Sequence, residues 1–197
     1  MVFRNIGFLG CGNMGGALAG ACAKRTKHIL LANRTPAKAE ALAAELNCQA
    51  ADNRAVAERC DLIFLGVKPQ MMGALLAELA PVLSARQDRF VLVSMAAGLT
   101  IGTIRAMAGG NYPVIRIMPN TPAAIGEGMI LYCAEGVETE EKTAFVDVMP
   151  VSYTHLVQLR RQRGLYDPQR QGLRAGAGCQ PGGQRCGCYS EDRHGGH

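Results

Sequence analysis

The sequence predicts an α/β fold with a Rossmann-like, doubly wound and mostly parallel sheet covered by helices on both faces. Short apolar runs alternate with amphipathic segments along the first 150 residues, which is typical of parallel strands buried on both faces. The first apolar run leads directly into a glycine-rich turn, 10–15, that opens the first helical segment. Loops rich in Gly, Pro and Asn follow the later runs, where open α/β sheets bind their ligands.

The expected elements follow one another in a regular alternation. We expect strands at the apolar runs 3–9, 28–32, 48–50, 61–67, 90–95, 114–118 and 129–132. We expect helices at 13–24, 36–46, 52–58, 69–83, 100–107 and 139–149, where apolar residues recur at helical spacing. Thr35 supplies an N-cap hydroxyl before the first-turn Pro36, and Asp52 can cap the third helix. Glu140 and Glu141 suit the first turn of the last helix, because acids favour the positive end of the helix dipole.

Charge and composition divide the chain near residue 150. Residues 1–150 carry 14 Lys and Arg against 13 Asp and Glu, a net charge of +1, whereas residues 151–197 carry 7 Arg against 3 acids, a net charge of +4. The second segment has few large apolar residues, too few to offset the entropy of ordering it. We therefore expect one NAD(P)-binding Rossmann domain at 1–150 and a disordered, non-native tail at 151–197.

The tail has no sustained hydrophobic period, and its Arg-only basicity and Gly/Cys content are typical of a wrong reading frame or a joined foreign sequence. This is a hypothesis from composition, and the encoding DNA past codon 150, read in all frames, would decide it. A metal-binding or nucleic-acid-binding tail is the alternative. The spacing of Cys179, Cys186, Cys188, His194 and His197 fits no usual zinc site, and the arginines lack interleaved aromatic residues.

Composition also disfavours several classes of protein. Because residues 1–150 are almost neutral, basicity does not indicate a nucleic-acid partner. Five scattered cysteines, 11, 22, 48, 60 and 133, are interpreted as small buried residues of a reducing compartment rather than a disulfide scaffold. The segment 6–23 is nearly uncharged, but Asn13 and several glycines interrupt it, which disfavours a signal peptide or membrane span. We expect a cytoplasmic protein with no metal, nucleic acid or membrane partner.

The strongest chemical signal is the GxGxxG motif at 10–15. Gly10 allows the tight turn, Gly12 lets the backbone approach a pyrophosphate, and Gly15 lets helix and strand pack closely. The helix that begins at Asn13 offers free N–H groups and a partial positive charge to phosphates. The motif predicts a dinucleotide site.

The end of the second expected strand predicts NADP(H) over NAD(H). NAD-selective sites usually place Asp or Glu about 20 residues after the glycines, but this chain has Asn33-Arg34-Thr35 there. Arg34 offers a fork for a 2′-phosphate, and Asn33 and Thr35 can add hydrogen bonds. Asn53 follows the third strand, where an adenine could lie, but part of a helix cap explains it equally well.

Three further loops follow strands at the expected ligand edge of the sheet. They are Gly66-Val67-Lys68-Pro69-Gln70, Ser94-Met95-Ala96-Ala97-Gly98 and Met118-Pro119-Asn120-Thr121-Pro122. The two prolines around Asn120 fix a rigid loop whose polar groups can face a nicotinamide, and the small residues at 96–98 leave room for its ring.

These segments together resemble a known family. GFLGCGNMGGAL, NRTPAK, VKPQ, SMAAGLTI and VIRIMPNTPAAIGEGM are similar, in this order from residue 6 to residue 149, to the N-terminal domain of pyrroline-5-carboxylate reductases. The resemblance implies an oxidoreductase of proline biosynthesis that reduces the C=N bond of 1-pyrroline-5-carboxylate to L-proline with NAD(P)H. The implied cofactor-binding residues, together with Gly15 from the motif above, are Leu9, Gly10, Cys11, Gly12, Asn13, Met14, Asn33, Arg34, Thr35, Asn53, Gly66, Val67, Lys68, Pro69, Ala97, Gly98 and Asn120.

The chain departs from this family after Pro150. The resemblance implies a helical second domain that forms the dimer and binds the substrate, and nothing after Pro150 matches it. We therefore assign no catalytic residue, expect the chain as written to be inactive or nearly so, and treat homo-oligomerisation as doubtful for it. The apolar side of the last helix, 145–149, is expected to be exposed.

Three alternatives stay open. The chain could be another β-hydroxyacid-dehydrogenase-like reductase, a cofactor-transhydrogenating reductase, or a non-catalytic NADP-binding fragment. Substrate profiling would separate the enzymes, and binding without turnover would indicate the fragment.

Overall fold

The structure is a computed structural model of the 197-residue chain, and it describes residues 3–119 and 130–149. Within these ranges one sheet has the strand order β3-β2-β1-β4-β5-β6-β7. Neighbouring strands are parallel except β7, which runs antiparallel to β6. The strands are β1 Ile6–Leu9, β2 Ile29–Ala32, β3 Gln49–Ala50, β4 Leu62–Leu65, β5 Val91–Ser94, β6 Val114–Pro119 and β7 Ile130–Glu135.

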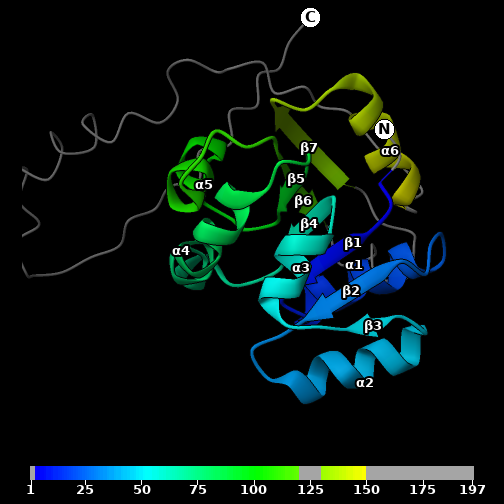
Figure 1. The fold of residues 1–197 in the computed structure, drawn as a ribbon. Helices are drawn as coiled ribbons and strands as arrows, with labels where there is room; N and C mark the ends of the chain where they lie inside the picture. Colours follow the sequence, from blue (N-terminus) through cyan, green and yellow to red (C-terminus); the bar gives the residue numbers. More distant parts are fainter. Residues whose placement is uncertain (1–2, 120–129, 150–197) are drawn as a thin grey trace, which may run out of the picture. The chain divides into compact units, whose positions relative to one another are not determined.

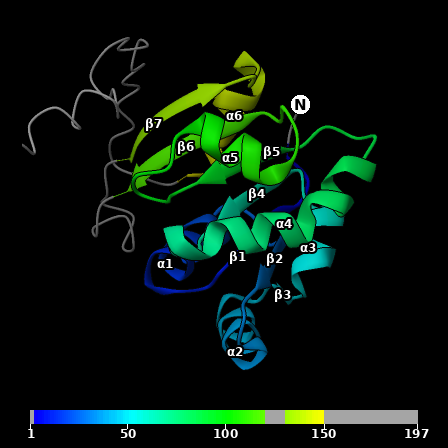
Figure 2. The same cartoon turned by 90° about the vertical axis from the view of Figure 1, so that its left-hand side faces the viewer.

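Helices alternate with the strands and lie on both faces of the sheet (Figures 1 and 2). They are α1 Asn13–Ala23, α2 Pro36–Leu46, α3 Asn53–Arg59, α4 Pro69–Ala85, α5 Ile101–Ala108 and α6 Thr139–Val148. Buried residues of α1, α2 and α6 belong to one hydrophobic cluster, and those of α3, α4 and α5 belong to a second. The predicted doubly wound, mostly parallel α/β fold is confirmed.

The strands separate these two clusters because successive strand side chains point to opposite faces. Phe8 lies in the first cluster and stacks on Phe64 with ring centroids 4.4 Å apart, whereas the next residue, Leu9, lies in the second. All four residues of β1, β2, β4 and β5 are buried, as near-continuous apolar runs predict for strands covered on both sides.

The expectation that the apolar side of the last helix would be exposed is wrong. Phe145 is fully buried, and its ring packs edge-on against Tyr132 at 5.6 Å. Met149 is 3% exposed and its sulfur lies 3.7 Å from the Cys22 thiol of α1. The helix therefore belongs to the core of this domain, because α1 and β7 leave a space that its apolar face fills.

Two local expectations also need correction. Thr35 is the N-cap residue of α2, but its side chain makes no capping hydrogen bond, and its carbonyl instead accepts from the Asn33 amide at 3.1 Å. Of the five cysteines interpreted as buried, only Cys22 and Cys60 are buried; the other three are partly exposed, and all five are free. The capping role of Asp52 is confirmed, because its carboxylate accepts from the Ala55 N–H at 2.6 Å.

The register of the sheet aligns the ends of its parallel strands. Leu9, the last residue of β1, pairs with Ala32 of β2 and Leu65 of β4, and Leu65 pairs with Ser94 of β5. The loops that follow these four residues therefore begin side by side at one edge of the sheet. We call this the carboxyl edge. No helix among the described residues is long and apolar enough to cross a membrane.

Candidate functional site

Three glycines meet where the loops after β1 and β4 touch. A Cβ on Gly15 would lie 2.1 Å from the carbonyl oxygen of Gly10, and one on Gly66 would lie 2.5 Å from the same oxygen. Gly10 itself has φ +106°, which side chains rarely tolerate. The Gly66 N–H donates to the Leu9 carbonyl at 2.8 Å and closes the junction. Only glycine fits at these three positions, which we call the glycine junction.

Gly12 differs from these glycines because it faces open space. A Cβ there would meet no atom within 4 Å, and the residue is exposed. It is the N-cap of α1, and the first intrahelical bond that follows it is donated by Gly16. The preceding N–H groups of an α-helix have no partner within the helix and carry its positive dipole end. This turn therefore has the form of an anion site with room for the ligand.

A side-chain hydrogen bond joins this turn to the loop after β2. The Cys11 N–H donates to Asn33 Oδ1 at 3.2 Å, and the Cys11 thiol donates to the Ala32 carbonyl at 3.5 Å. Burial, and to a smaller extent the neighbouring Cys48, raises the pKa of the Cys11 thiol to about 11. Cys11 is therefore a neutral thiol at physiological pH and a poor nucleophile.

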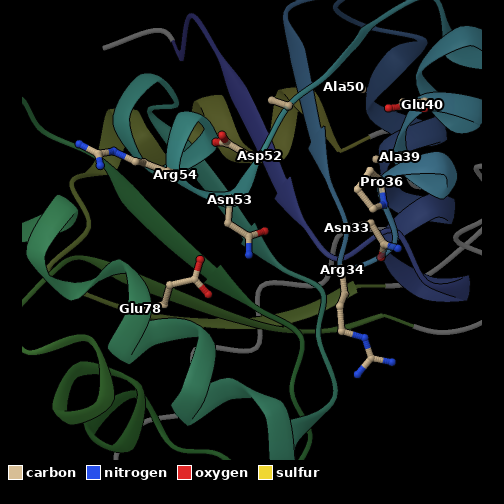
Figure 3. A pocket seen from close by; sticks show the side chains of 11 residues that line it. Asn33, Arg34, Pro36, Ala39, Glu40, Ala50, Asp52, Asn53, Arg54 and Glu78 are labelled. Carbon is tan, nitrogen blue, oxygen red and sulfur yellow. The ribbon is translucent and has the colours of Figure 1, made fainter.

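A cavity of about 600 Å³ opens beside this loop (Figure 3). The residues that line it come from the loop after β2, from α2, from the end of β3, the start of α3 and the segment between them, and from α4. They are Asn33, Arg34, Pro36, Ala39, Glu40, Ala50, Ala51, Asp52, Asn53, Arg54 and Glu78. Three residues predicted from sequence, Asn33, Arg34 and Asn53, thus share one cavity.

The polar side chains of the cavity differ in whether they already have partners. The carboxylate of Asp52 caps α3, and Arg54 pairs with Glu58 at 2.7 Å. By contrast, Arg34 is exposed and makes no ion pair with any residue that the structure describes. Arg34 is therefore the cavity cation that is available to an anionic ligand.

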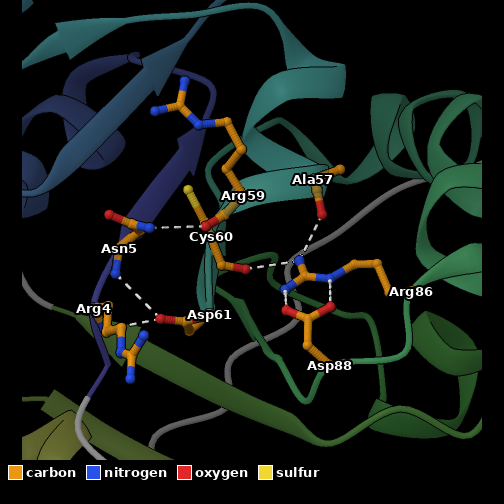
Figure 4. A network of polar contacts seen from close by, with 8 residues as sticks. All are labelled: Arg4, Asn5, Ala57, Arg59, Cys60, Asp61, Arg86 and Asp88. Carbon is orange, nitrogen blue, oxygen red and sulfur yellow. Dashed lines mark hydrogen bonds and ion pairs between the residues drawn. The ribbon is translucent and has the colours of Figure 1, made fainter.

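Arg86 fixes α3, whose first residues line the cavity (Figure 4). Its Nη1 donates to the carbonyls of Ala57 and Cys60, at 2.6 and 2.8 Å, at the end of α3. The guanidinium also pairs with Asp88 and lies 4.5 Å from the centre of the Phe90 ring. Because its side chain is only 5% exposed, this arginine ties α3 to the start of β5 with little competition from water.

A second group of contacts holds the segment around β1 and β4 from the opposite edge of the sheet. Asp61 accepts from the N–H groups of Arg4 and Asn5, at 2.8 and 3.2 Å, and the Asn5 amide donates to the Arg59 carbonyl at 3.1 Å (Figure 4). These bonds fix the start of β1 beside the start of β4, and so support the register that aligns their ends at the glycine junction.

The residues predicted to border a nicotinamide follow β4 and β5 at the carboxyl edge. Lys68 is the N-cap residue of α4 and Pro69 is its first residue, and both are exposed. Ala97 and Gly98 are exposed, and a Cβ on Gly98 would meet nothing within 4 Å. Asn120 lies outside the described residues, so its place is still a prediction.

The structure thus brings the predicted residues to one edge of the sheet, where some of them contact one another and others do not. Direct contacts connect the residues of the glycine junction with Cys11 and Asn33, and the cavity adds Arg34 and Asn53. Thr35 lies beside them, whereas no described contact links 97–98 to the others.

The sequence did not predict Glu40, Arg54 and Glu78 as site residues, because only the strand order brings α2, α3 and α4 around one cavity. No described group of three or more His, Cys, Asp or Glu could hold a metal.

Comparison with known proteins finds one matching family model and several similar enzymes. Residues 5–98 match the family described as NADP oxidoreductase, coenzyme F420-dependent. The pyrroline-5-carboxylate reductase of Escherichia coli (strain K12) is 36% identical over 148 residues, which cover 73% of this chain and 54% of that protein. The chain spans about half the length of the curated relatives it matches.

Solved structures agree in fold. The pyrroline carboxylate reductase of Plasmodium falciparum with NADP bound is 27% identical, with a TM-score of 0.63 over 78% of this chain and 58% of that chain. The imine reductase of Myxococcus stipitatus in complex with NADP+ is 28% identical, with a TM-score of 0.63 over 78% and 55%. Residues 5–98 of this chain thus match the model of the NADP oxidoreductase, coenzyme F420-dependent family, and the chain resembles pyrroline-5-carboxylate reductases in sequence and fold.

Proposed function

We propose that the carboxyl edge binds NADP(H) and that the chain is the cofactor-binding part of a pyrroline-5-carboxylate reductase. The observation that carries this proposal is the arrangement of Asn33 and Arg34. Both line the cavity, and Asn33 is bonded to the glycine-rich turn. One ligand can therefore extend from the turn into the cavity, as a dinucleotide requires.

The residues of the edge fit such a ligand. The open position at Gly12 and the N-terminus of α1 suit a pyrophosphate. The guanidinium of Arg34, which has no ion pair among the described residues, suits a 2′-phosphate, because an arginine fork matches phosphate geometry. Two relatives of known structure contain NADP or NADP+. These observations favour NADP(H) over NAD(H), with NAD(H) as a weaker ligand.

For the reaction, we propose reduction of the C=N bond of 1-pyrroline-5-carboxylate to L-proline, the activity for which the first relatives are named. NADPH supplies the hydride when bound. The described residues hold it, with the loops after β4 and β5 on the nicotinamide side. His28 is exposed at the start of β2, opposite to the carboxyl edge, so we do not propose it as a proton donor. We assign no described residue to the substrate carboxylate.

The test is a pair of measurements on the 197-residue chain. Calorimetry should show NADPH binding with a Kd of about 1 μM to 1 mM, the usual range for enzyme substrates. Oxidation of NADPH with 1-pyrroline-5-carboxylate should be slow or absent, because we propose no described residue that binds the substrate carboxylate or donates a proton to the imine. Absence of NADPH binding would overturn the proposal. Turnover at a rate normal for enzymes would uphold the activity and refute the expected inactivity.

A wider imine reductase activity is the second candidate, because the Myxococcus stipitatus imine reductase is as similar in fold as the Plasmodium falciparum enzyme. The same assay with a cyclic imine that lacks the carboxylate separates the two. Oxidation of NADPH by that imine at a higher rate than by 1-pyrroline-5-carboxylate would favour the wider class.

A further inference from the structure

Three polar side chains lie in a row where β5, β6 and β7 pair, within an otherwise apolar face of the sheet. Arg116 of β6 pairs with Ser94 of β5 on one side and with Cys133 of β7 on the other. Paired residues of neighbouring strands point to the same face. That face belongs to the second hydrophobic cluster, because Leu92 and Val114, two residues earlier on their strands, lie in it and Cys133 packs against it. We call the three residues the polar row.

The polar row contains hydrogen-bond donors without acceptors. In the described part of the chain, Arg116 Nε is the one buried side-chain nitrogen or oxygen that has no hydrogen-bond partner. The Arg116 guanidinium also makes no ion pair with any described residue. Ser94 is fully buried, and its hydroxyl accepts from the Ala96 N–H at 3.3 Å but donates to no described atom. Buried donors without acceptors destabilise a fold, and charged ones most of all.

No described carboxylate pairs with the polar row. Glu135 lies on the same face, two residues after Cys133, but its carboxylate pairs with Arg105 at 3.2 Å. The face is open to solvent further along the same two strands, where Met118 and Leu131 pair with each other and are 56% and 37% exposed. A small ion from solution can therefore reach the row.

We propose that the polar row binds a compact monovalent anion such as chloride. One unit of negative charge compensates one guanidinium, and an ion that only accepts hydrogen bonds suits N–H, O–H and the weaker S–H donors. Neighbouring strands lie about 4.8 Å apart, so one small ion is within reach of both Arg116 and Ser94. A water molecule would leave the charge uncompensated. The site is separate from the cavity beside Arg34, and the inference does not rest on NADP(H) binding.

Thermal unfolding of the intact chain in 0–300 mM sodium chloride tests the inference, with sodium gluconate, a bulkier anion, keeping the ionic strength constant. An ion that binds the folded state raises the unfolding midpoint. For a Kd of about 10–50 mM, we expect a midpoint about 2–6 °C higher in 300 mM chloride than in gluconate alone. Arg116→Met should abolish this shift. In gluconate its midpoint should not lie below that of the wild type, because the variant removes a charge that has no partner.

Two further variants complete the test. Arg59→Met is the matched control, because Arg59 is exposed and has no ion pair among the described residues, so it should keep the chloride shift. Ser94→Ala keeps the charge of the row but removes the hydroxyl, so it should lose about half of the shift or more. Equal wild-type midpoints in chloride and gluconate would overturn the inference. A shift of wild-type size in both Arg116→Met and Ser94→Ala would place chloride elsewhere and overturn it as well. Neither result affects the proposed function, which NADPH titration tests separately.

Discussion

The backbone N–H of Cys11 donates a hydrogen bond to the side-chain oxygen of Asn33 at 3.2 Å. This bond connects the glycine-rich turn after β1 to the loop after β2, so the two parts of the proposed dinucleotide site share one support. The Asn33 amide also donates to the Thr35 carbonyl at 3.1 Å, which fixes its orientation. The shape of the turn therefore depends on a residue that also lines the cavity.

Replacing Asn33 should separate these two roles. Asn33→Ala removes the acceptor of the Cys11 N–H, and we expect the free energy of unfolding to fall by about 1 kcal/mol. NADPH and NADH should both bind more weakly, since both use the turn. Asn33→Asp keeps the acceptor but places a carboxylate beside the proposed 2′-phosphate, so only NADPH should lose affinity. Equal losses for both cofactors in Asn33→Asp would contradict this.

Arg34 should determine the preference for NADPH. In Arg34→Gln we expect NADPH affinity to fall by about ten-fold or more, because a charge-assisted contact with the 2′-phosphate is lost, while NADH affinity stays within about two-fold. Arg54→Gln is the control, since Arg54 lines the same cavity but pairs with Glu58. If both variants change the ratio of NADPH affinity to NADH affinity to the same extent, the cause is the general charge of the cavity and not recognition of the 2′-phosphate by Arg34.

Alanine substitutions at two glycines of the motif should have different effects, one on stability and the other on NADPH binding. Gly15→Ala drives a Cβ to 2.1 Å from the Gly10 oxygen, so the free energy of unfolding should fall by about 1–3 kcal/mol. Gly12→Ala meets no protein atom, so stability should change by less than about 1 kcal/mol. Its methyl group instead occupies the place proposed for the pyrophosphate.

Denaturant unfolding and calorimetric titration measure the two effects. Gly12→Ala should keep the wild-type unfolding midpoint and lose about ten-fold or more in NADPH affinity, on the premise that the backbone must approach the pyrophosphate. Undiminished NADPH binding by Gly12→Ala would place the phosphates elsewhere.

Glu141 should make the domain sensitive to acid. Burial alone would raise the pKa of this carboxyl, but hydrogen bonds from Arg89 and from the Glu138 N–H hold the pKa below its usual range. A carboxylate with a lowered folded-state pKa stabilises the fold above its unfolded-state pKa. This stabilisation is lost as the pH falls through the lower, folded-state value. Chemical unfolding between pH 7 and pH 3 should show this loss.

Arg89→Met tests the same pair. It leaves the Glu141 carboxylate buried with fewer donors, and the free energy of unfolding at pH 7 should fall by about 2 kcal/mol, reduced from a fully buried pair because Arg89 is partly exposed. The variant raises the pKa of Glu141, so the difference from wild type should shrink toward pH 3. A difference that is constant over this range would show that packing, and not charge, is the cause.

Much of this fold follows from local sequence signals. The apolar runs predicted the strands, because burial on both faces demands continuous apolar residues. Some strands are shorter than their runs, because residues such as Phe3 and Phe90 are buried but lie outside the hydrogen-bonded ladder. The glycine motif predicted the turn because positive φ and a backbone contact exclude every other residue there.

The errors arose where tertiary packing decides. Phe145 and Met149 were expected to be exposed, because their apolar character fits equally well against a partner domain and against α1. Glu78 carries no local signal, since an exposed acid on a long helix is usually only solvated. Its place in the cavity depends on the strand order, which sets α4 beside α3.

Hydrogen–deuterium exchange of the 197-residue chain, with and without NADPH, tests the central claim most directly. The account predicts slower exchange at 10–16, 32–35, 51–55 and 66–70, the segments that form the glycine junction, the cavity and the loop after β4. Exchange at 25–28 and 59–62, on the opposite edge of the sheet, should not change. Protection confined to that opposite edge, or no protection at saturating NADPH, would contradict it.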